Sequence, residues 1–253
     1  MLKDIRRQQI YDIIKQKKDV TIDYLVETCY SSHATIRRDL EDMENNGIIR
    51  RIHGGATLLD SKSIEPAQSL REQENADKKS IIANLAVDFL SNNQSVFLDS
   101  STTNRYLIPL LKKYSGMTYI SNSFKSAHEL TEIIDADVYL SGGKVARSTN
   151  SVSGTITCEF MDRWHTDIAI MACRGASFLY GATVVSAEQS DVKRKMIKNA
   201  KSSLLLCDSS KFEKSFLCKF ADFSDFSAFI CDQRPPDALY DAIDRSGCEV
   251  VFP

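Results

Sequence analysis

A run of short polar side chains stands where an apolar stretch of the chain ends. Residues 95–98 predict a buried strand, and five residues lie between it and the next helical pattern: Asp99, Ser100, Ser101, Thr102 and Thr103. Free backbone N–H groups and the helix dipole at such a junction favour an anion, and hydroxyls add hydrogen bonds. We therefore predict that this turn holds a phosphate, although Ser and Thr before a helix also serve as caps.

Small and polar residues follow three more predicted strands. They are Asn122 and Ser123 after residues 118–120, Gly142, Gly143 and Lys144 after residues 138–140, and Lys211 after residues 203–207. Ligands of open α/β sheets bind at the carboxyl ends of the strands. We therefore expect one effector site, where Lys211 supplies charge to a phosphate, Asp99 and Asn122 bond sugar hydroxyls, and the glycines admit close backbone approach.

A second group of residues has the chemistry for binding DNA. Ile36, Leu40 and Met43 lie on one face of a predicted helix, so Thr35 and the adjacent arginines project elsewhere near its N-terminus. In helix-turn-helix proteins that end enters the major groove, where arginine bonds guanine edges or phosphates. The predicted DNA-binding residues are Ser31, Ser32, His33, Thr35, Arg37, Arg38, Arg50, Arg51 and His53. On an isolated helix, Arg37 and Arg38 would instead form a solvated face paired with neighbouring acids.

The first 58 residues predict a winged helix-turn-helix domain. Apolar residues recur at helical spacing over residues 10–14, 22–29 and 36–43, with Ser31 or Ser32 as the cap of the third helix and Gly47 at its end. Residues 48–55 alternate apolar and basic side chains and end in paired glycines, which favours a β-hairpin. Residues 59–75 are polar and predict a linker, partly helical.

Residues 76–253 predict an α/β sensing domain with a mostly parallel sheet covered on both faces. Apolar runs typical of buried strands alternate with helical patterns. The predicted strands are 95–98, 118–120, 138–140, 168–172, 203–207, 226–230 and 249–252, and the predicted helices are 81–90, 106–111, 124–134, 187–200 and 238–246.

Composition narrows the function. The net charge of the 253 residues is -2, so DNA binding depends on a local group of basic side chains. The seven cysteines are scattered and lack metal-binding spacing, which predicts reduced thiols, no metal and no cofactor. No apolar run is long enough for a membrane span, and the N-terminus is charged from its third residue. We expect a soluble cytoplasmic protein.

Residues 34–40 and 47–56 together resemble the recognition helix and wing of the DeoR family of bacterial sugar-metabolism repressors. The resemblance extends from Leu2 to Asp232 and includes the four polar strand ends. It implies a homo-oligomer, dimer or tetramer, that binds operator double-stranded DNA. It also implies a sensor of a phosphorylated sugar, related in fold to ribose-5-phosphate isomerase, and no catalysis.

Two residues depart from the family pattern. Ser101 stands where glycine is usual, which affects how closely backbone approaches a phosphate, and Arg174 stands where an acidic residue is usual. Arg174 either recruits a second anionic group or marks a different ligand. Glu188, at the start of a charged helix, either contacts effector hydroxyls or is simply solvated.

Three functions are compatible with these residues. The first is a transcriptional repressor of a carbohydrate operon controlled by a phosphorylated sugar. The second is a sugar-phosphate isomerase-like enzyme with an appended DNA-binding module, which needs a positioned acid or base, and Arg174 argues against it. The third is a constitutive DNA-binding protein with a vestigial second domain.

Overall fold

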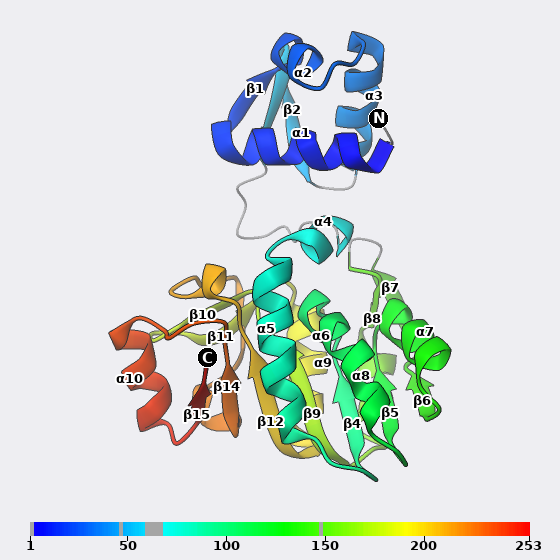
Figure 1. Ribbon diagram of the computed structural model, residues 1–253, viewed down its shortest axis with the longest axis vertical. Helices are drawn as coiled ribbons and strands as arrows, with labels where there is room; N and C mark the ends of the chain where they lie inside the picture. Colours follow the sequence, from blue (N-terminus) through cyan, green and yellow to red (C-terminus); the bar gives the residue numbers. More distant parts are fainter. Residues whose placement is uncertain (1–2, 46–47, 59–67, 147–148) are drawn as a thin grey trace. The chain divides into compact units, whose positions relative to one another are not determined.

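The computed structural model describes residues 3–45, 48–58, 68–146 and 149–253. By its internal contacts the chain forms two compact units, Met1–Arg71 and Glu72–Pro253 (Figure 1). Within the described ranges, no helix combines the length and the apolar character that a bilayer-spanning segment requires.

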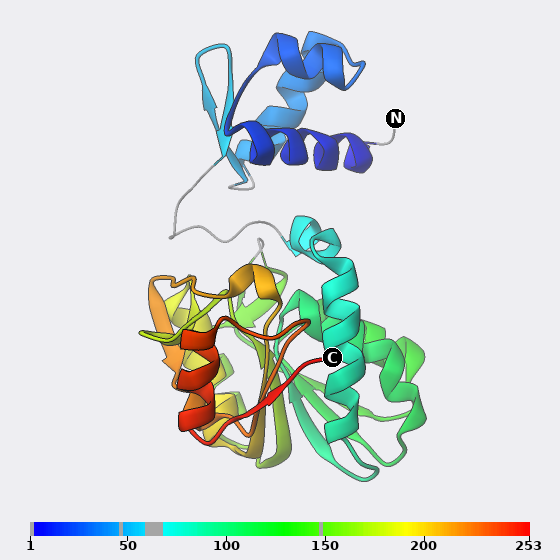
Figure 2. The ribbon, with the colours of Figure 1, turned by 60° about the vertical axis from the view of Figure 1, so that its left-hand side comes forward.

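The N-terminal unit has three helices and a small antiparallel sheet. Its elements are α1 (Lys3–Lys17), β1 (Asp19–Thr21), α2 (Ile22–Thr28), α3 (His33–Asn45), β2 (Ile49–Ile52) and β3 (Gly55–Leu58). The sheet order is β1-β3-β2, and Figure 2 shows the β2–β3 hairpin beside the helices. The winged helix-turn-helix prediction is confirmed, but β1 was missed because a single apolar residue between two polar ones is too short a pattern to indicate a strand. The predicted role of Gly47 lies outside the described residues.

Local chemistry explains how this unit closes. The fully buried Ile10, Leu25 and Ile36 bring the three helices onto one core. Ser32, not Ser31, caps α3: its Oγ accepts a hydrogen bond from the N–H of Thr35 at 3.2 Å. Gly55 is required where β3 meets β1, since a Cβ there would lie 2.1 Å from the Val20 carbonyl oxygen.

Seven parallel strands form the centre of the C-terminal unit. Their order is β15-β14-β12-β9-β4-β5-β6, and every pairing is parallel. The strands are β4 (Ser95–Leu98), β5 (Thr118–Ser121), β6 (Asp137–Leu140), β9 (Thr166–Ala172), β12 (Ala200–Leu206), β14 (Ala228–Ile230) and β15 (Glu249–Val251). The predicted α/β class with a mainly parallel sheet is confirmed.

Helices cover both faces of this sheet, as both views show (Figures 1 and 2). One apolar cluster joins alternate strand residues such as Leu98 and Ile170 to α5 (Ala76–Ala86), α6 (Thr102–Leu107) and α7 (Phe124–Ile133). The other joins Phe97 and Met171 to α8 (Thr155–Met161), α9 (Ala187–Lys198) and α10 (Asp237–Arg245). Successive side chains of a strand point to opposite faces, so both faces bury apolar residues.

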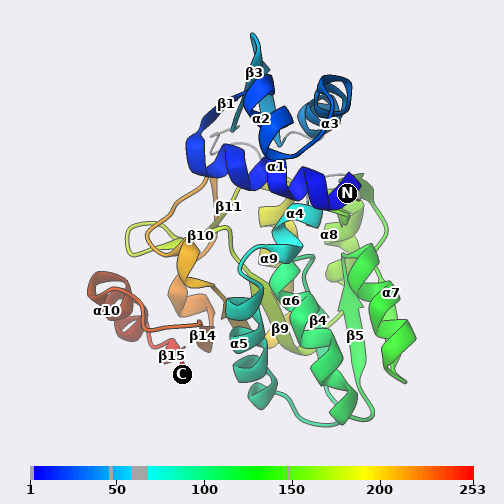
Figure 3. The ribbon, with the colours of Figure 1, turned by 45° about the horizontal axis from the view of Figure 1, so that its top comes forward.

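The helix α4 (Gln68–Gln73) lies in the segment that was predicted to be a partly helical linker. Several other short elements were not predicted: α8, β7 (Lys144–Ala146), β8 (Ser151–Ser153), β10 (Gly175–Ser177), β11 (Gly181–Val184) and β13 (Cys218–Ala221). Strands β10, β11 and β13 form a separate antiparallel sheet, whose β10–β11 hairpin projects from the parallel sheet in Figure 3. These strands consist mostly of small or polar residues, so they lack the apolar run that marks the strands of the parallel sheet.

Several predicted boundaries were wrong. The helix predicted over 81–90 begins at Ala76 and ends at Ala86, before the 3-10 turn Val87–Phe89, and the strand predicted over 203–207 begins at Ala200. The helix over residues 106–111 is the end of α6 followed by the 3-10 helix Ile108–Lys113, because Pro109 has no N–H to continue the α-helical ladder. The strand predicted over 226–230 begins only at Ala228, because Phe226 ends the short 3-10 turn Phe223–Asp225.

Buried ion pairs hold α1 against α3. The carboxylate of Asp39, on α3, is 2.6 Å from Arg6 Nε and 3.5 Å from Arg7 Nε, and only 2% of its side chain is exposed. Asp42 is bound by Arg7 and Lys3 but is 35% exposed. Because a charge buried without its partner is costly, the Asp39 contacts are the essential ones.

Replacing Asp39 with Asn removes the negative charge that compensates Arg6 and Arg7. We expect the free energy of unfolding of the N-terminal unit to fall by about 3 kcal/mol. Amide hydrogen exchange in α1 and α3 of the intact chain measures this loss. The matched variant Asp42→Asn should cost much less, because its ion pairs are solvated. Equal losses in the two variants would contradict the assignment.

Candidate functional site

The two arginines of α3 have no ion-pair partner in the described ranges. Arg37 and Arg38 are exposed, and neither forms a salt bridge there. Of the three acids that a solvated-face interpretation would assign to them, Asp39 and Asp42 are bound by basic residues of α1, and Glu41 forms no ion pair with either arginine among the described residues. The guanidinium groups of α3 are therefore available to a ligand outside the unit.

The other predicted DNA-binding residues divide into two kinds. Arg50 and His53 are exposed on the β2–β3 hairpin. Arg51 already contacts Glu44: its backbone N–H donates to the Glu44 carboxylate at 2.8 Å, and its side-chain Nε lies 4.0 Å from the same group. The hairpin thus offers at least two uncommitted cationic or polar groups beside the basic helix.

The N-terminal end of α3 is built from short polar contacts. His33 Nε2 lies 2.8 Å from the Asp23 carboxylate of α2, and Ser32 Oγ lies 2.9 Å from Thr35 Oγ1. These contacts hold His33, Ser32 and Thr35 at the helix terminus. Ser31 has a different contact, because its hydroxyl donates to the Cys29 carbonyl oxygen at 3.1 Å.

One exposed aromatic residue was missed by the sequence patterns. Tyr30, in the turn between α2 and α3, is 92% exposed and has a φ of +50°, a conformation rare for a residue with a Cβ. Its position between Cys29 and the Ser31-Ser32 pair was the available signal, because a large ring in a tight polar turn has no core to enter.

In the C-terminal unit, the predicted effector residues follow five neighbouring strands. The order β6-β5-β4-β9-β12 places the ends of these strands at one edge of the sheet. Adjacent strands are about 4.8 Å apart, so the edge from β6 to β12 spans about 19 Å. A single small ligand therefore contacts only part of the predicted set.

Asp99 occupies the middle of this edge and is fully engaged within the protein. One carboxylate oxygen accepts hydrogen bonds at 2.8 Å from the N–H of Ser101 and from Asn104 Nδ2. The other accepts from the N–H of Ala172 at 3.2 Å and from Lys193 Nζ. Asp99 thus connects the turn after β4 to β9 and α9. Its partner Lys193 was not among the predicted site residues.

Ser101 also has a structural role. Its Oγ caps α6 by accepting from the N–H of Asn104 at 3.2 Å, and α6 is only six residues long. The side chain of Thr103 enters the first turn of that helix and is fully buried. Part of the turn that was predicted to bind a phosphate therefore serves to stabilise its own conformation.

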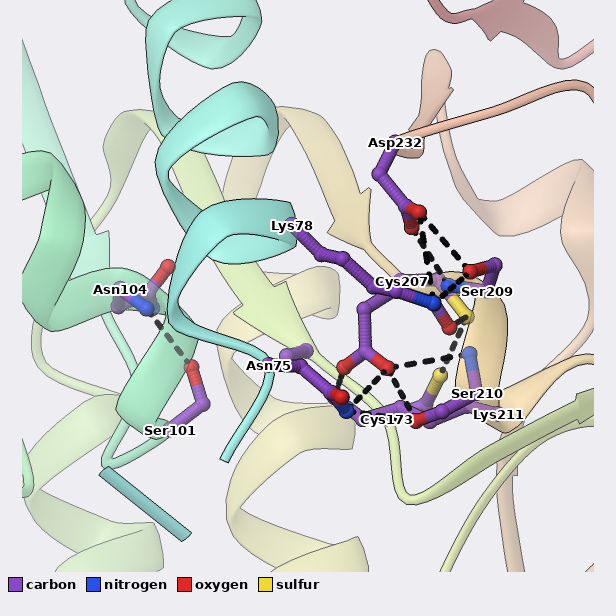
Figure 4. Close-up of polar contacts among 12 residues, drawn as sticks. Asn75, Lys78, Ser101, Asn104, Cys173, Cys207, Ser209, Ser210, Lys211 and Asp232 are labelled. Carbon is purple, nitrogen blue, oxygen red and sulfur yellow. Dashed lines mark hydrogen bonds and ion pairs between the residues drawn. The ribbon is translucent and has the colours of Figure 1, made fainter. Parts of the chain in front are cut away.

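Lys211 and Asp208 form an ion pair at the end of β12, 2.9 Å apart (Figure 4). Asp208 also accepts from Asn75 Nδ2 at 3.2 Å and from the Ser210 hydroxyl. Burial alone raises the pKa of Asp208, but Lys211 and the hydrogen bonds outweigh it and bring this pKa to about 2. Most of the charge of Lys211 is consequently compensated inside the protein.

The beginning of α5 is tied to the same strand end. Lys78 Nζ donates to Ser209 Oγ at 2.6 Å and lies 3.8 Å from Asp232, while Asp232 accepts from the N–H and the hydroxyl of Ser209. Figure 4 shows these side chains grouped at the beginning of α5. The helix, β12 and the loop after β14 are therefore one polar unit.

On the opposite side of the edge, Lys144 pairs with Glu188 at 2.9 Å, and Ser153 Oγ donates to the same carboxylate at 3.0 Å. These contacts lower the pKa of Glu188. Gly143 has a φ of +136°, and a Cβ there would lie 2.3 Å from Thr157 Oγ1, so only glycine fits. Lys144 and Glu188 were both predicted as site residues, and the structure brings them together. Both side chains are exposed, however, and their opposite charges neutralise each other.

Unpartnered buried polar atoms gather along the same edge. Within the described part of the chain, six such atoms on this edge have no hydrogen-bond partner: Thr103 Oγ1, Asn104 Oδ1, Asn122 Oδ1, Ser141 Oγ, Arg174 Nε and Asp208 Oδ2, the last of which lies in the ion pair with Lys211. They belong to segments that follow β4, β5, β6, β9 and β12. The other unpartnered atoms of the described residues, on Arg7, Gln68, Tyr119 and Thr166, lie elsewhere. Buried polar atoms are normally satisfied, so a group of exceptions indicates a place where a polar ligand completes the bonding.

Arg174 is the cation of this edge without a carboxylate. Lys193, Lys211, Lys144 and Lys78 each pair with an acid, whereas no ion pair of Arg174 is found among the described residues. Its guanidinium carbon lies 5.5 Å from the centre of the Phe216 ring. The uncompensated positive charge of Arg174 is therefore available at the end of β9 to bind an anion.

Within the described residues, no cluster of three or more His, Cys, Asp or Glu side chains has the arrangement of a metal site. The polar groups of the edge that lie outside its ion pairs are hydroxyls, amides and one guanidinium, which suit a polar organic anion. A helix with two unpaired arginines in one unit and such an edge in the other define a ligand-responsive DNA-binding regulator.

Comparison with known proteins gives the family. Residues 6–62 match the DeoR-like helix-turn-helix domain, and residues 74–233 match the DeoR C-terminal sensor domain. The chain belongs to the DeoR family of transcriptional regulators.

Relatives match along almost their whole length. The HTH-type transcriptional regulator GlpR of Haloferax volcanii is 30% identical, with 99% of this chain and 98% of the relative covered. The HTH-type transcriptional repressor GlcR of Bacillus subtilis is 30% identical over 99% and 96%. The L-fucose operon activator of Haemophilus influenzae is 29% identical over 92% and 94%. These relatives are regulators of transcription.

Among solved structures, ribose 5-phosphate isomerase A of Methanocaldococcus jannaschii covers 55% of each chain, with 16% identity and a TM-score of 0.40. We base no conclusion about activity on a likeness at this distance.

The Asp208–Lys211 pair makes stability depend on pH. A carboxyl whose pKa falls from 3.8 in the unfolded chain to about 2 stabilises the fold above about pH 4, and this contribution is lost as the pH drops toward 2. The loss amounts to about 2 kcal/mol. Urea unfolding of the wild type and of Asp208→Asn over this pH range measures it. The variant should be less stable at neutral pH, with a shallower decline on acidification, and parallel declines would contradict the role given to Asp208.

Proposed function

We propose that this chain is a transcriptional repressor of a carbohydrate operon whose binding to its operator is controlled by a phosphorylated sugar. The observation that carries the proposal is the sorting of charge: Arg37 and Arg38 on α3 and Arg174 at the sheet edge are left without carboxylate partners among the described residues. Two sets of uncompensated cations suit two anionic ligands, DNA and a phosphate.

The recognition helix reads the operator in this proposal. Arg37 and Arg38 enter the major groove, with Thr35 and Ser32 at the helix terminus contacting phosphate or a thymine methyl. Arg50 and His53 of the hairpin contact the flanking backbone. Ser31, His33 and Arg51 remain candidates for the same surface, and Tyr30 is added because its exposed ring is held in the connecting turn.

The effector lies across β5, β4 and β9. Asn122, Thr103 and Arg174 supply unpartnered buried atoms from segments after these three consecutive strands. The distance from β5 to β9 is two strand spacings, about 10 Å, which suits one phosphorylated sugar. Asn122 and Thr103 bond sugar hydroxyls, and Arg174 takes the anionic group. Lys211, with Asp208 beside it, contributes less charge than its residue type suggests.

We also propose that the edge is not catalytic. Asp99, Asp208 and Glu188 are each paired with a lysine. The pKa of Asp208 is about 2 and that of Glu188 is lowered, whereas a general base works best with a pKa near the operating pH. A turnover assay with pentose and hexose phosphates tests this proposal. Measurable isomerisation would favour the alternative, a sugar-phosphate isomerase-like enzyme with an appended DNA-binding module.

Ligand control requires two arrangements of an oligomer. In a homodimer or tetramer the recognition helices of two subunits reach half-sites about 34 Å apart, or a multiple of that distance. An effector that binds one arrangement better shifts the population and thereby changes operator affinity. Analytical ultracentrifugation with and without operator DNA tests the oligomeric state.

Arg38→Ala is expected to weaken operator binding without loss of folding, since the side chain is exposed. If Arg38 contacts a base edge, its loss weakens binding by about 1–3 kcal/mol and relaxes the sequence preference. If it contacts a phosphate, its loss weakens binding to all sequences and reduces the slope of log affinity against log salt concentration by about 1. Fluorescence anisotropy with cognate and scrambled DNA at several salt concentrations distinguishes the two. Lys112→Ala, an exposed charge change in the other unit, is the control. Unchanged affinity of the Arg38 variant would exclude this helix as the reading element.

Arg174→Gln is expected to weaken effector binding by about tenfold or more, because a guanidinium–phosphate contact is worth more than 1.4 kcal/mol. The measurement is the thermal shift produced by phosphorylated sugars, first screened on the wild type. Arg163→Gln, which changes an exposed arginine elsewhere, serves as control. Operator binding without effector should be unchanged. An undiminished thermal shift would place the anion elsewhere on the edge.

A further inference from the structure

Two buried cysteines face each other at the ends of neighbouring strands. Cys173 follows β9 and Cys207 follows β12, directly after the paired residues Ala172 and Leu206. Their Sγ atoms are 3.6 Å apart, and the thiol of Cys173 donates to Cys207 (Figure 4). Each is followed by a residue with a role at the edge, Arg174 and Asp208.

We propose that Cys173 and Cys207 form a reversible oxidation site, which closes to a disulfide when a peroxide reaches the edge. This inference goes beyond the regulatory function proposed above and does not depend on it. Of the seven free cysteines, Cys173 and Cys207 have their sulfur atoms in direct contact within the described residues.

The backbone geometry allows the bond. Neighbouring parallel strands place paired Cα atoms about 4.8 Å apart, which is within the range of disulfides. The sulfur atoms need to approach by only about 1.5 Å, which side-chain rotation provides without strand separation. The pairing of β9 with β12 over residues 166–172 and 200–206 fixes this juxtaposition.

The two thiols differ in reactivity. Cys173 is 5% exposed and Cys207 is fully buried. The hydrogen bond between the two thiols lowers the pKa of Cys173, and Lys211 acts in the same direction, whereas burial raises the pKa of Cys207. Because the thiolate is the nucleophile, Cys173 is the residue that meets the oxidant.

The chemistry balances with hydrogen peroxide as the oxidant. The Cys173 sulfur attacks one peroxide oxygen, the O–O bond breaks, and the departing hydroxide takes the thiol proton as water. Cys207 then attacks the sulfenic sulfur of Cys173, the S–O bond breaks, and a second water leaves with the proton of Cys207. Two thiols thus lose two electrons and two protons to one peroxide.

The site lies within the polar unit at the end of β12. Lys211 and Asp208 adjoin both sulfurs, since each influences the pKa of Cys173 and of Cys207. A disulfide here joins the two strand ends that carry Arg174 and Asp208. Oxidation therefore fixes the spacing between β9 and β12 at the edge, whichever ligand binds there.

Peroxide treatment of the intact chain tests the proposal. After the remaining thiols are blocked with N-ethylmaleimide under denaturing conditions, peptide mass spectrometry should find Cys173 linked to Cys207, and thiol titration should fall by two. Dithiothreitol should restore both thiols. Recovery of Cys173 and Cys207 as maleimide adducts, or their linkage to other cysteines, would overturn the proposal.

Variants separate the two roles. In Cys207→Ser, peroxide should leave Cys173 as a sulfenic acid that dimedone traps, while Cys231→Ser should still form the disulfide. Cys231 is a fitting control because it is equally buried and its pKa is raised to about 12 by burial. If Cys207→Ser does not fold, the peptide mapping of the wild type decides the question alone. Disulfide formation in Cys207→Ser that still includes Cys173 would contradict the pairing.

Discussion

A charge leaves water only when another charge or several dipoles replace the solvent, and this constraint shapes both units of the protein. In the N-terminal unit it pairs Asp39 with Arg6 and Arg7, so that α1 and α3 pack with their charges matched. In the C-terminal unit it pairs Asp99 with Lys193 beneath the edge of the sheet. The charges left over are those at which ligands are expected.

The Asp99–Lys193 pair also explains why the edge has a definite shape. Asp99 receives hydrogen bonds from the turn after β4 and from the N–H of Ala172, while Lys193 donates to the carbonyl oxygen of Ala172 at 2.8 Å. Two strands and a helix therefore meet at one carboxylate. A site built from such shared contacts is preorganised, and its ligand need not order the loops that bind it.

Much of the fold was predictable because its main elements carry a clear apolar pattern. The helices of the N-terminal unit repeat apolar residues at helical spacing, and the strands of the parallel sheet are largely apolar runs, although several have only three or four residues. Strands β7, β8, β10, β11 and β13 are equally short but consist mostly of small or polar residues, and their pairing depends on tertiary context. Pro109 was visible in the sequence, yet its effect on α6 was not anticipated.

The candidate site was predictable only as a location. Polar residues after apolar strands indicate the carboxyl edge, but residue type does not say which side chains serve the protein itself. Asp99 and Lys211 look like ligand groups in the sequence, whereas the structure commits both to ion pairs. Asp99 pairs with a lysine 94 residues away, whereas Lys211 pairs with an aspartate only three residues away. Distance along the chain alone therefore does not explain why these ion pairs were not predicted. Which side chains form ion pairs depends on the three-dimensional geometry. Arg174, which departs from the family pattern, is left with a charge that no ion pair compensates among the described residues, so we expect it to contribute most to binding an anionic ligand.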